Sequence, residues 1–229
     1  MAKCLRMQGK CLYYIKRYDE AWMLMNQALD IAIQIDNKKQ IVACHKQLYY
    51  LCREFKRVMN ERGDEQASTL FFRESLLHEM YFSEKPRLAE LTVRYEALRC
   101  DIMQQYYMNK DYDNVIRIAT SLDIHDDADP NASCLVYYYK AQAYVKLENY
   151  PMAKEAFFRE LELRKKYLGW EEEDTILACQ NLGVLHSFCN EREEALACFR
   201  EAYGYEVKKN GEDSEMAQKL LQYISVVES

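Results

Sequence analysis

Residues that interrupt helices are scarce in this sequence. Its 229 residues include six glycines and three prolines, the two residue types that most disfavour a helix interior. This scarcity predicts long helices joined by short turns. No apolar run approaches the roughly 18 residues of a bilayer-spanning helix, so the sequence predicts no membrane span.

The motifs of common enzyme active sites are also missing. The chain has no Gly-rich phosphate loop, no G-x-S-x-G and no H-E-x-x-H. Its four histidines, at 45, 78, 125 and 186, lie far apart in sequence, and His125 stands in an aspartate-rich stretch that we interpret as an acidic turn. We therefore predict no enzyme, no catalytic residue and no cofactor.

The nine cysteines form no C-x-x-C pair. Most fall at helical core spacing, beside leucine, tyrosine or phenylalanine. An odd, scattered set without metal-binding spacing indicates buried reduced thiols and no metal site. Together with an N-terminal helix that lacks a signal-peptide core, this predicts a cytoplasmic protein.

Charge is unevenly distributed along the chain. The formal net charge is −6, yet residues 1–62 carry twelve Lys/Arg and six Asp/Glu, against 19 and 31 in the remainder. The acidic majority argues against nucleic acid as a partner, although 19 tyrosines offer stacking groups. The basic N-terminal part instead favours an acidic partner segment.

A repeat with a spacing of 42 residues organises the C-terminal half. The stretch from Asn149 matches the stretch from Glu191, so that Ala153 corresponds to Ala195, Phe157 to Phe199 and Gly169 to Gly211. A fixed period in a helical pattern is typical of an α-solenoid, in which each unit buries its apolar face against its neighbours. The predicted fold class is therefore all-α.

The first hairpin carries a resemblance to a known family. Small residues at Gly9, Ala21 and Ala28 alternate with large ones at Leu5, Leu12, Tyr18 and Met25, as in the helix–turn–helix unit of tetratricopeptide (TPR) repeats. In the last unit, Cys179–His186 resembles the Leu-Asn-Asn-Leu-Ala-Val-Leu-Tyr run of 42-residue kinesin light-chain repeats. The segment from Leu76 to Leu98 resembles the one that follows TPR repeats in bacterial sensor and regulator proteins.

The resemblance implies one TPR solenoid, an α-α superhelix over residues 1–229 with about five hairpins. They are expected at 2–36, 38–82, 84–123, 132–168 and 172–210, with a C-terminal capping helix at 213–228. Ser83 is expected to cap a long helix over 84–109, and Asp123–Asn131 is the predicted loop. The third repeat is the most degenerate, because Val115 and Ala119 stand where the family has alanine and phenylalanine.

In this family a concave groove lined by first-helix residues is the binding surface. Carried over to this chain, the groove residues are Lys3, Arg6, Lys10, Tyr13, Tyr14, Tyr50, Arg53, Arg57, Gln104, Tyr107, Tyr138, Gln142, Gln180, Asn181 and Val184. Five of them are basic and belong to the first two repeats. Cations three to four residues apart share a helical face, which predicts a basic cradle for carboxylates or an acidic peptide.

The sequence thus favours a non-enzymatic interaction module that binds a peptide or a partner helix in its groove. The alternative is a peptide-sensing TPR segment of a bacterial regulator or sensor protein. The identity of the partner and the oligomeric state stay open at this point.

Overall fold

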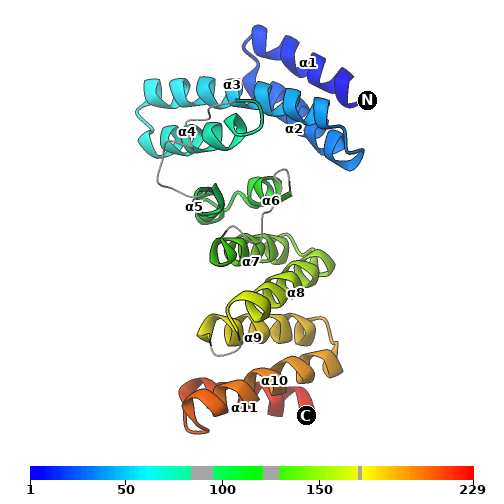
Figure 1. Ribbon diagram of the computed structural model, residues 1–229, viewed down its shortest axis with the longest axis vertical. Helices are drawn as coiled ribbons and strands as arrows, with labels where there is room; N and C mark the ends of the chain where they lie inside the picture. The colour runs from blue at the N-terminus through cyan, green and yellow to red at the C-terminus, as the bar shows by residue number, and fades with distance from the viewer. Residues whose placement is uncertain (84–94, 121–128, 170–171) are drawn as a thin grey trace. The chain divides into compact units, whose positions relative to one another are not determined.

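The structure is a computed structural model that describes residues 1–83, 95–120, 129–169 and 172–229. Every regular element in these ranges is an α-helix (Figure 1). The helices are α1 (Ala2–Tyr14), α2 (Tyr18–Gln34), α3 (Lys38–Arg62), α4 (Glu65–Glu79), α5 (Tyr95–Met108), α6 (Tyr112–Thr120), α7 (Pro130–Lys146), α8 (Tyr150–Tyr167), α9 (Glu173–Phe188), α10 (Arg192–Asn210) and α11 (Glu215–Glu228). The prediction of an all-α chain is confirmed. None of the described helices is both long and apolar enough to cross a bilayer.

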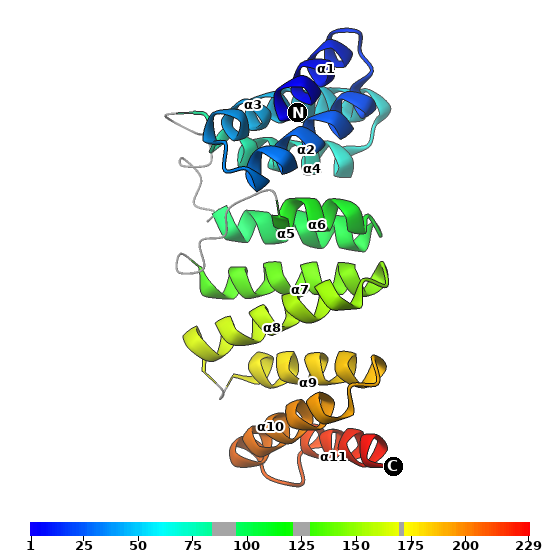
Figure 2. The ribbon, with the colours of Figure 1, turned by 90° about the vertical axis from the view of Figure 1, so that its right-hand side faces the viewer.

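The chain divides into two compact units, the first with α1–α5 and the second with α6–α11. In the first unit α1 packs on α2, α3 on α4, and α2 joins the two hairpins by its contact with α3. In the second unit α7 packs on α8 and α9 on α10, with α8 against α9 and α11 against α10 (Figure 2). The described residues thus contain four helix pairs, α1/α2, α3/α4, α7/α8 and α9/α10, and α11 follows the last pair.

The predicted third repeat is described helix by helix, because α5 lies in the first unit and α6 in the second. The beginning of its expected first helix, residues 84–94, lies outside the described residues, as do residues 123–128 of the predicted loop and Trp170. At the end of that loop α7 begins at Pro130, two residues earlier than expected. A single solenoid that runs through the whole chain stays a prediction.

Polar residues fix where several helices begin. The side chains of Asn37, Asp64, Asp129, Asn149 and Ser214 each accept a hydrogen bond from the backbone N–H three residues later, at 2.9–3.4 Å. These bonds satisfy backbone donors that have no partner inside the helix. Proline occupies the first turn of α7 and α8, where its missing N–H costs nothing.

The 42-residue period reappears in the turns between paired helices. Glu148 and Asn190 both adopt left-handed backbone angles, with φ of 58° and 60°. In each turn the next N–H returns to the preceding helix, Asn149 to the Tyr144 carbonyl and Glu191 to the His186 carbonyl, both at 2.9 Å. The shared geometry ends each first helix in the same way and sends the chain back along it.

Small residues set the distance between paired helices. A Cβ added to Gly9 of α1 would lie 3.2 Å from the Ala21 carbonyl oxygen of α2. A Cβ added to Gly183 of α9 would lie 2.8 Å from Phe199 Cε1 of α10, closer than van der Waals contact permits. Around these contacts lie the apolar cores, which include Met25, Leu48 and Phe55 in the first unit and Phe157, Ile176 and Phe199 in the second.

Cysteine burial follows the prediction in part. Cys44, Cys52, Cys100, Cys134 and Cys179 are buried. Cys4 and Cys11, however, are exposed on α1, so the expectation of burial was wrong for these two. In the first hairpin the core is filled from α1 by Leu5, Leu12 and Tyr13, which leaves both thiols on the outer face.

The close approach at Gly183 gives a paired prediction. Gly183→Ala should lower the free energy of unfolding by about 1–3 kcal/mol, because the new methyl group overlaps Phe199. Gly204→Ala, in an exposed part of α10 with nothing within 4 Å, should raise it by about 0.8–1 kcal/mol through helix propensity. Urea unfolding of both variants measures the shifts, and shifts of the same sign would contradict the packing argument.

Candidate functional site

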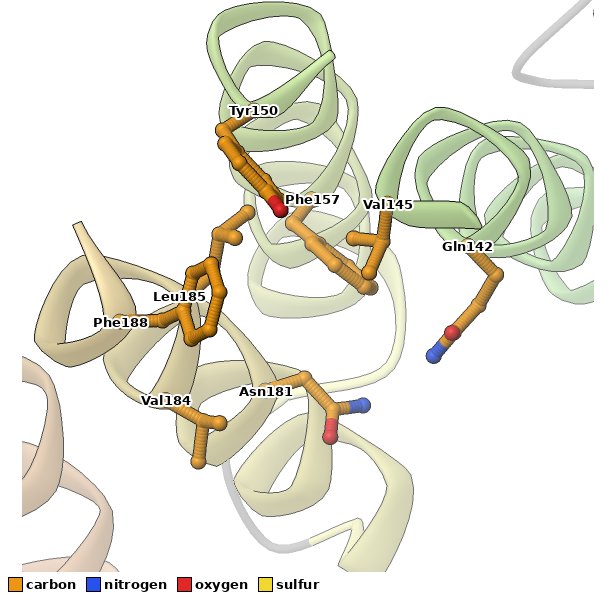
Figure 3. Close-up of a pocket in the computed structure, with 8 residues that line it drawn as sticks. All are labelled: Gln142, Val145, Tyr150, Phe157, Asn181, Val184, Leu185 and Phe188. Atoms are coloured by element: carbon orange, nitrogen blue, oxygen red, sulfur yellow. The ribbon is translucent and has the colours of Figure 1, made fainter. Parts of the chain in front are cut away.

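An apolar pocket lies between the first helices of the last two hairpins in the second unit. It has a volume of about 250 Å³ and takes residues from α7, α8 and α9: Gln142, Val145, Tyr150, Phe157, Asn181, Val184, Leu185 and Phe188 (Figure 3). Phe157 and Leu185 form part of the core beneath it. Gln142 and Asn181 bring amide groups to the pocket from the two facing helices (Figure 3).

The composition of this pocket suits an apolar side chain. The rings of Tyr150 and Phe188 lie 5.1 Å apart between centroids, and no charged residue lines the space. Its volume falls below the about 300–1,000 Å³ of typical small-molecule sites. The pocket therefore has room for about one side chain, and its two amides can donate and accept hydrogen bonds.

A polar pocket of about 470 Å³ lies in the first unit. Its lining comes from α1, α3 and α4: Tyr13, Tyr50, Arg53, Glu54, Lys56, Arg57, Asn60, Phe72 and Ser75. Burial, and secondarily the negative charge of Glu54, raise the pKa of the Tyr13 phenol. This tyrosine consequently stays a neutral hydrogen-bonding group at physiological pH.

Ion pairing distinguishes the cations of the polar pocket. The Arg57 guanidinium contacts Glu54 Oε2 at 3.1 Å and Glu61 Oε1 at 2.6 Å, and these hydrogen bonds raise the arginine's pKa. Arg53 contacts the Tyr49 hydroxyl at 3.4 Å, and Lys56 Nζ lies 4.5 Å from the Phe72 ring centroid. Within the described part of the chain, neither Arg53 nor Lys56 forms an ion pair. Both are available to an anionic group.

The predicted groove residues differ in exposure. Lys3, Tyr14, Tyr50, Arg53, Arg57, Gln104 and Val184 are exposed, Arg6, Lys10, Tyr13, Tyr107, Tyr138, Gln142 and Asn181 are half-buried, and Gln180 is buried. Seven of the fifteen line one of the two pockets: Tyr13, Tyr50, Arg53 and Arg57 in the first unit, and Gln142, Asn181 and Val184 in the second.

The other predicted residues have different surroundings. Arg6 Nε donates to Gln40 Oε1 at 3.2 Å, which ties α1 to α3. Lys10 lies 5.8 Å from the centroid of the Tyr14 ring. Tyr138 packs on Phe157 with 6.4 Å between ring centroids, and Gln180 is 6% exposed. Arg57 is thus already paired with carboxylates, whereas Arg6 uses one of its five N–H donors within the protein, and the basic cradle of five residues stays a prediction.

The sequence reasoning missed the residues that come from second helices. Phe72 and Ser75 of α4, and Tyr150 and Phe157 of α8, line the pockets although groove positions were taken from first helices alone. Phe188 was also missed, and it is 65% exposed at the end of α9. In the sequence, its place as an aromatic residue directly before a predicted turn could have indicated a surface position.

His186 shows how the last hairpin ties to its neighbour. Its Nδ1 lies 2.6 Å from Glu191 Oε2, and Glu191 also pairs with Lys154 of α8. The hydrogen bonds from Lys154 and His186 lower the pKa of Glu191. The histidine is therefore half-buried with a hydrogen-bond partner.

The chain is similar to solved structures of other helical proteins at low sequence identity. No family model and no curated protein matches the chain. Among solved structures, BtubC (BKLC) from P. vanneervenii has 14% identity and a TM-score of 0.54, over 89% of this chain and 80% of that one. A TPR2AB domain of yeast Sti1 in complex with pHSP90 gives 16% and 0.45, over 100% and 99%. A thermophilic TPR protein of Thermus thermophilus gives 14% and 0.35, over 98% and 100%.

At these identities the likeness to BtubC concerns the fold alone. The consecutive antiparallel hairpins and the close approach of paired helices at small residues agree with it. Within each unit the chain has the all-α fold of consecutive helix pairs that this likeness shows.

The apolar pocket gives a prediction. Val184→Asp should weaken binding of an aromatic probe such as p-cresol at least about tenfold, because a carboxylate beside the pocket must be desolvated. Val184 is 43% exposed, so folding should tolerate the change. Saturation-transfer NMR at increasing probe concentration measures it. The matched control is Val226→Asp, at a 71% exposed site on α11, and equal loss in both variants would contradict the assignment.

Proposed function

We propose that this protein is a non-enzymatic interaction module that binds peptide segments of a protein partner on its first-helix faces. The apolar pocket would hold an apolar side chain of the partner, and the polar pocket would hold a carboxylate. The observation that carries the proposal is that residues of neighbouring hairpins converge on both pockets. Each pocket is formed in a separate unit, so each is proposed as a binding element in its own right.

The preference for acidic segments rests on Arg53 and Lys56. Arg57 is already paired with two carboxylates, so it contributes mainly by orienting Glu54. A partner carboxylate between Arg53 and Lys56 would gain charge-assisted hydrogen bonds, each worth about 1.5–3 kcal/mol. Tyr13, Tyr50 and Asn60 add hydroxyl and amide groups that bind peptide backbone.

Geometry also favours binding over catalysis. The residues of the apolar pocket include no nucleophile–base pair, and the polar pocket combines arginine, lysine and tyrosine without a histidine or cysteine. Side chains of this kind recognise carboxylates and apolar groups. We therefore extend the proposal to a protein without catalytic activity of its own.

The test is a peptide array in which acidic, neutral and basic peptides share the same apolar residues. The protein should retain acidic peptides preferentially, and Arg53→Glu/Lys56→Glu should weaken their binding at least about tenfold. Fluorescence anisotropy on the best peptide gives the dissociation constants. Binding should also weaken with added salt, because ions screen the exposed charges.

The control is Lys38→Glu/Lys39→Glu, which makes the same charge change at exposed positions of α3 outside the pocket. If this control loses acidic peptides as strongly, net charge and not the pocket governs binding. If wild-type protein shows no preference for acidic peptides, the carboxylate proposal is wrong.

A further inference from the structure

A buried cluster of potential metal ligands lies in the first unit and shares no residue with the polar pocket. The thiol of Cys52 and the side chains of Glu74 and His78 each place one ligand atom within 4.8 Å of the other two. All three side chains are buried, Cys52, Glu74 and His78 at 0% exposure. No spacing motif marks this group, because Cys52 comes from α3 and the other two from α4.

Helical spacing brings the ligands to one place. Glu74 and His78 are four residues apart and share one face of α4. Cys52 lies on α3, which forms the hairpin with α4. His78 Nε2 lies 3.6 Å from Glu74 Oε1. In a tetrahedral zinc site with bonds of about 2.0–2.3 Å, neighbouring ligand atoms stand about 3.3–3.7 Å apart, so this distance fits a shared ion.

Two further residues, His45 and Tyr106, contact the ligand side chains at their second polar atoms. His45 Nδ1 lies 2.9 Å from His78 Nδ1, on the other side of the ring from the atom that faces Glu74. The Tyr106 hydroxyl of α5 donates to Glu74 Oε2 at 2.6 Å, whereas Oε1 is the oxygen nearer to His78. Metal-binding histidines and carboxylates are commonly oriented by such hydrogen bonds on their second atom. His45 is itself fixed by stacking on Tyr81, at 3.7 Å between centroids.

Charge balance indicates which ion suits this site. Thiolate, imidazole and carboxylate together are typical of zinc and related borderline divalent ions, whereas calcium and magnesium prefer oxygen ligands alone. A divalent ion with one thiolate, one carboxylate and one neutral imidazole is neutral overall. In a fully buried site this matters, because an uncompensated charge there is costly.

We propose that Cys52, Glu74 and His78 bind a zinc-class divalent ion, with His45 and Tyr106 as positioning residues. The ion would join α3 to α4 and, through Tyr106, both of them to α5. Three protein ligands leave a fourth position for water or another donor. Because the ligands are buried, the metal would enter as the unit folds.

The first experiment uses the untagged full chain, refolded from denaturant with zinc chloride or with a chelator and then passed through gel filtration. Inductively coupled plasma mass spectrometry should find about one zinc ion per chain in the protein refolded with zinc. The zinc-refolded protein should also unfold at a higher temperature than the chelator-refolded one. Absence of retained zinc would overturn the proposal and leave the cluster as a hydrogen-bonded polar network.

Cobalt(II) chloride reports on the ligands. The refolded wild type should show the ligand-field bands of tetrahedral cobalt and a thiolate-to-cobalt charge-transfer band. Cys52→Ser should lose the charge-transfer band, whereas Cys44→Ser, an equally buried thiol on the same helix, should keep it. Cobalt bound without a charge-transfer band in wild type would contradict the assignment of Cys52.

The variant Tyr106→Phe tests positioning. Removal of its hydrogen bond to Glu74 should lower zinc affinity about ten- to hundredfold. Competition with a chromophoric chelator measures this affinity. The cobalt spectrum of the variant should stay the same as that of wild type. A purely structural Tyr106 would change thermal stability and leave zinc affinity unchanged. The wild-type spectrum and this variant decide the question even if Cys52→Ser does not fold.

Discussion

The contact between paired helices at small side chains is the constraint on which the rest of the structure depends. A Cβ at Gly183 would overlap Phe199, and one at Gly9 would lie closer to Ala21 than ordinary van der Waals contact. Interiors are packed so tightly that such contacts fix both separation and register. Once each pair is fixed, its outer apolar residues face the next pair, so α2 meets α3 and α8 meets α9. Both pockets follow from this order, because each is lined by the first helices of two consecutive hairpins, α1 and α3 in one and α7 and α9 in the other.

Ion pairs within single helices reduce the positive surface charge that the composition of residues 1–62 indicates. The basic excess of residues 1–62 is real, yet Arg17 pairs with Glu20, and Arg57 with Glu54 and Glu61, all within one helical turn. Such exposed pairs contribute little to stability, but they reduce the positive potential of the surface. For this reason the proposed carboxylate site is limited to Arg53 and Lys56, with tyrosines and an asparagine beside them in the pocket.

The sequence predicted the fold well because its strongest patterns are local. Gly9, Ala21 and Ala28 are spaced for one helical face, and the 42-residue repeat places Ala153 and Ala195 at equivalent packing positions, both fully buried. The candidate sites were less predictable. Phe72 and Tyr150 reach the pockets from second helices, and His78 meets Cys52 from another helix. Contacts of this kind depend on how side chains of different helices meet, which periodicity within one helix does not encode.

Phe157 contributes both to the hydrophobic core and to the apolar pocket, and this limits which substitutions can change the ligand preference of the pocket. This ring belongs to the hydrophobic core and also forms the floor of the apolar pocket. Any substitution there would alter the fold and the preference together, so selection for folding restricts it. Gln142, Asn181 and Val184 are exposed or half-buried and outside that core. Substitutions that change ligand preference without affecting folding are therefore expected at Gln142, Asn181 and Val184. Related proteins with this pocket would differ at these positions and keep the aromatic residue at position 157.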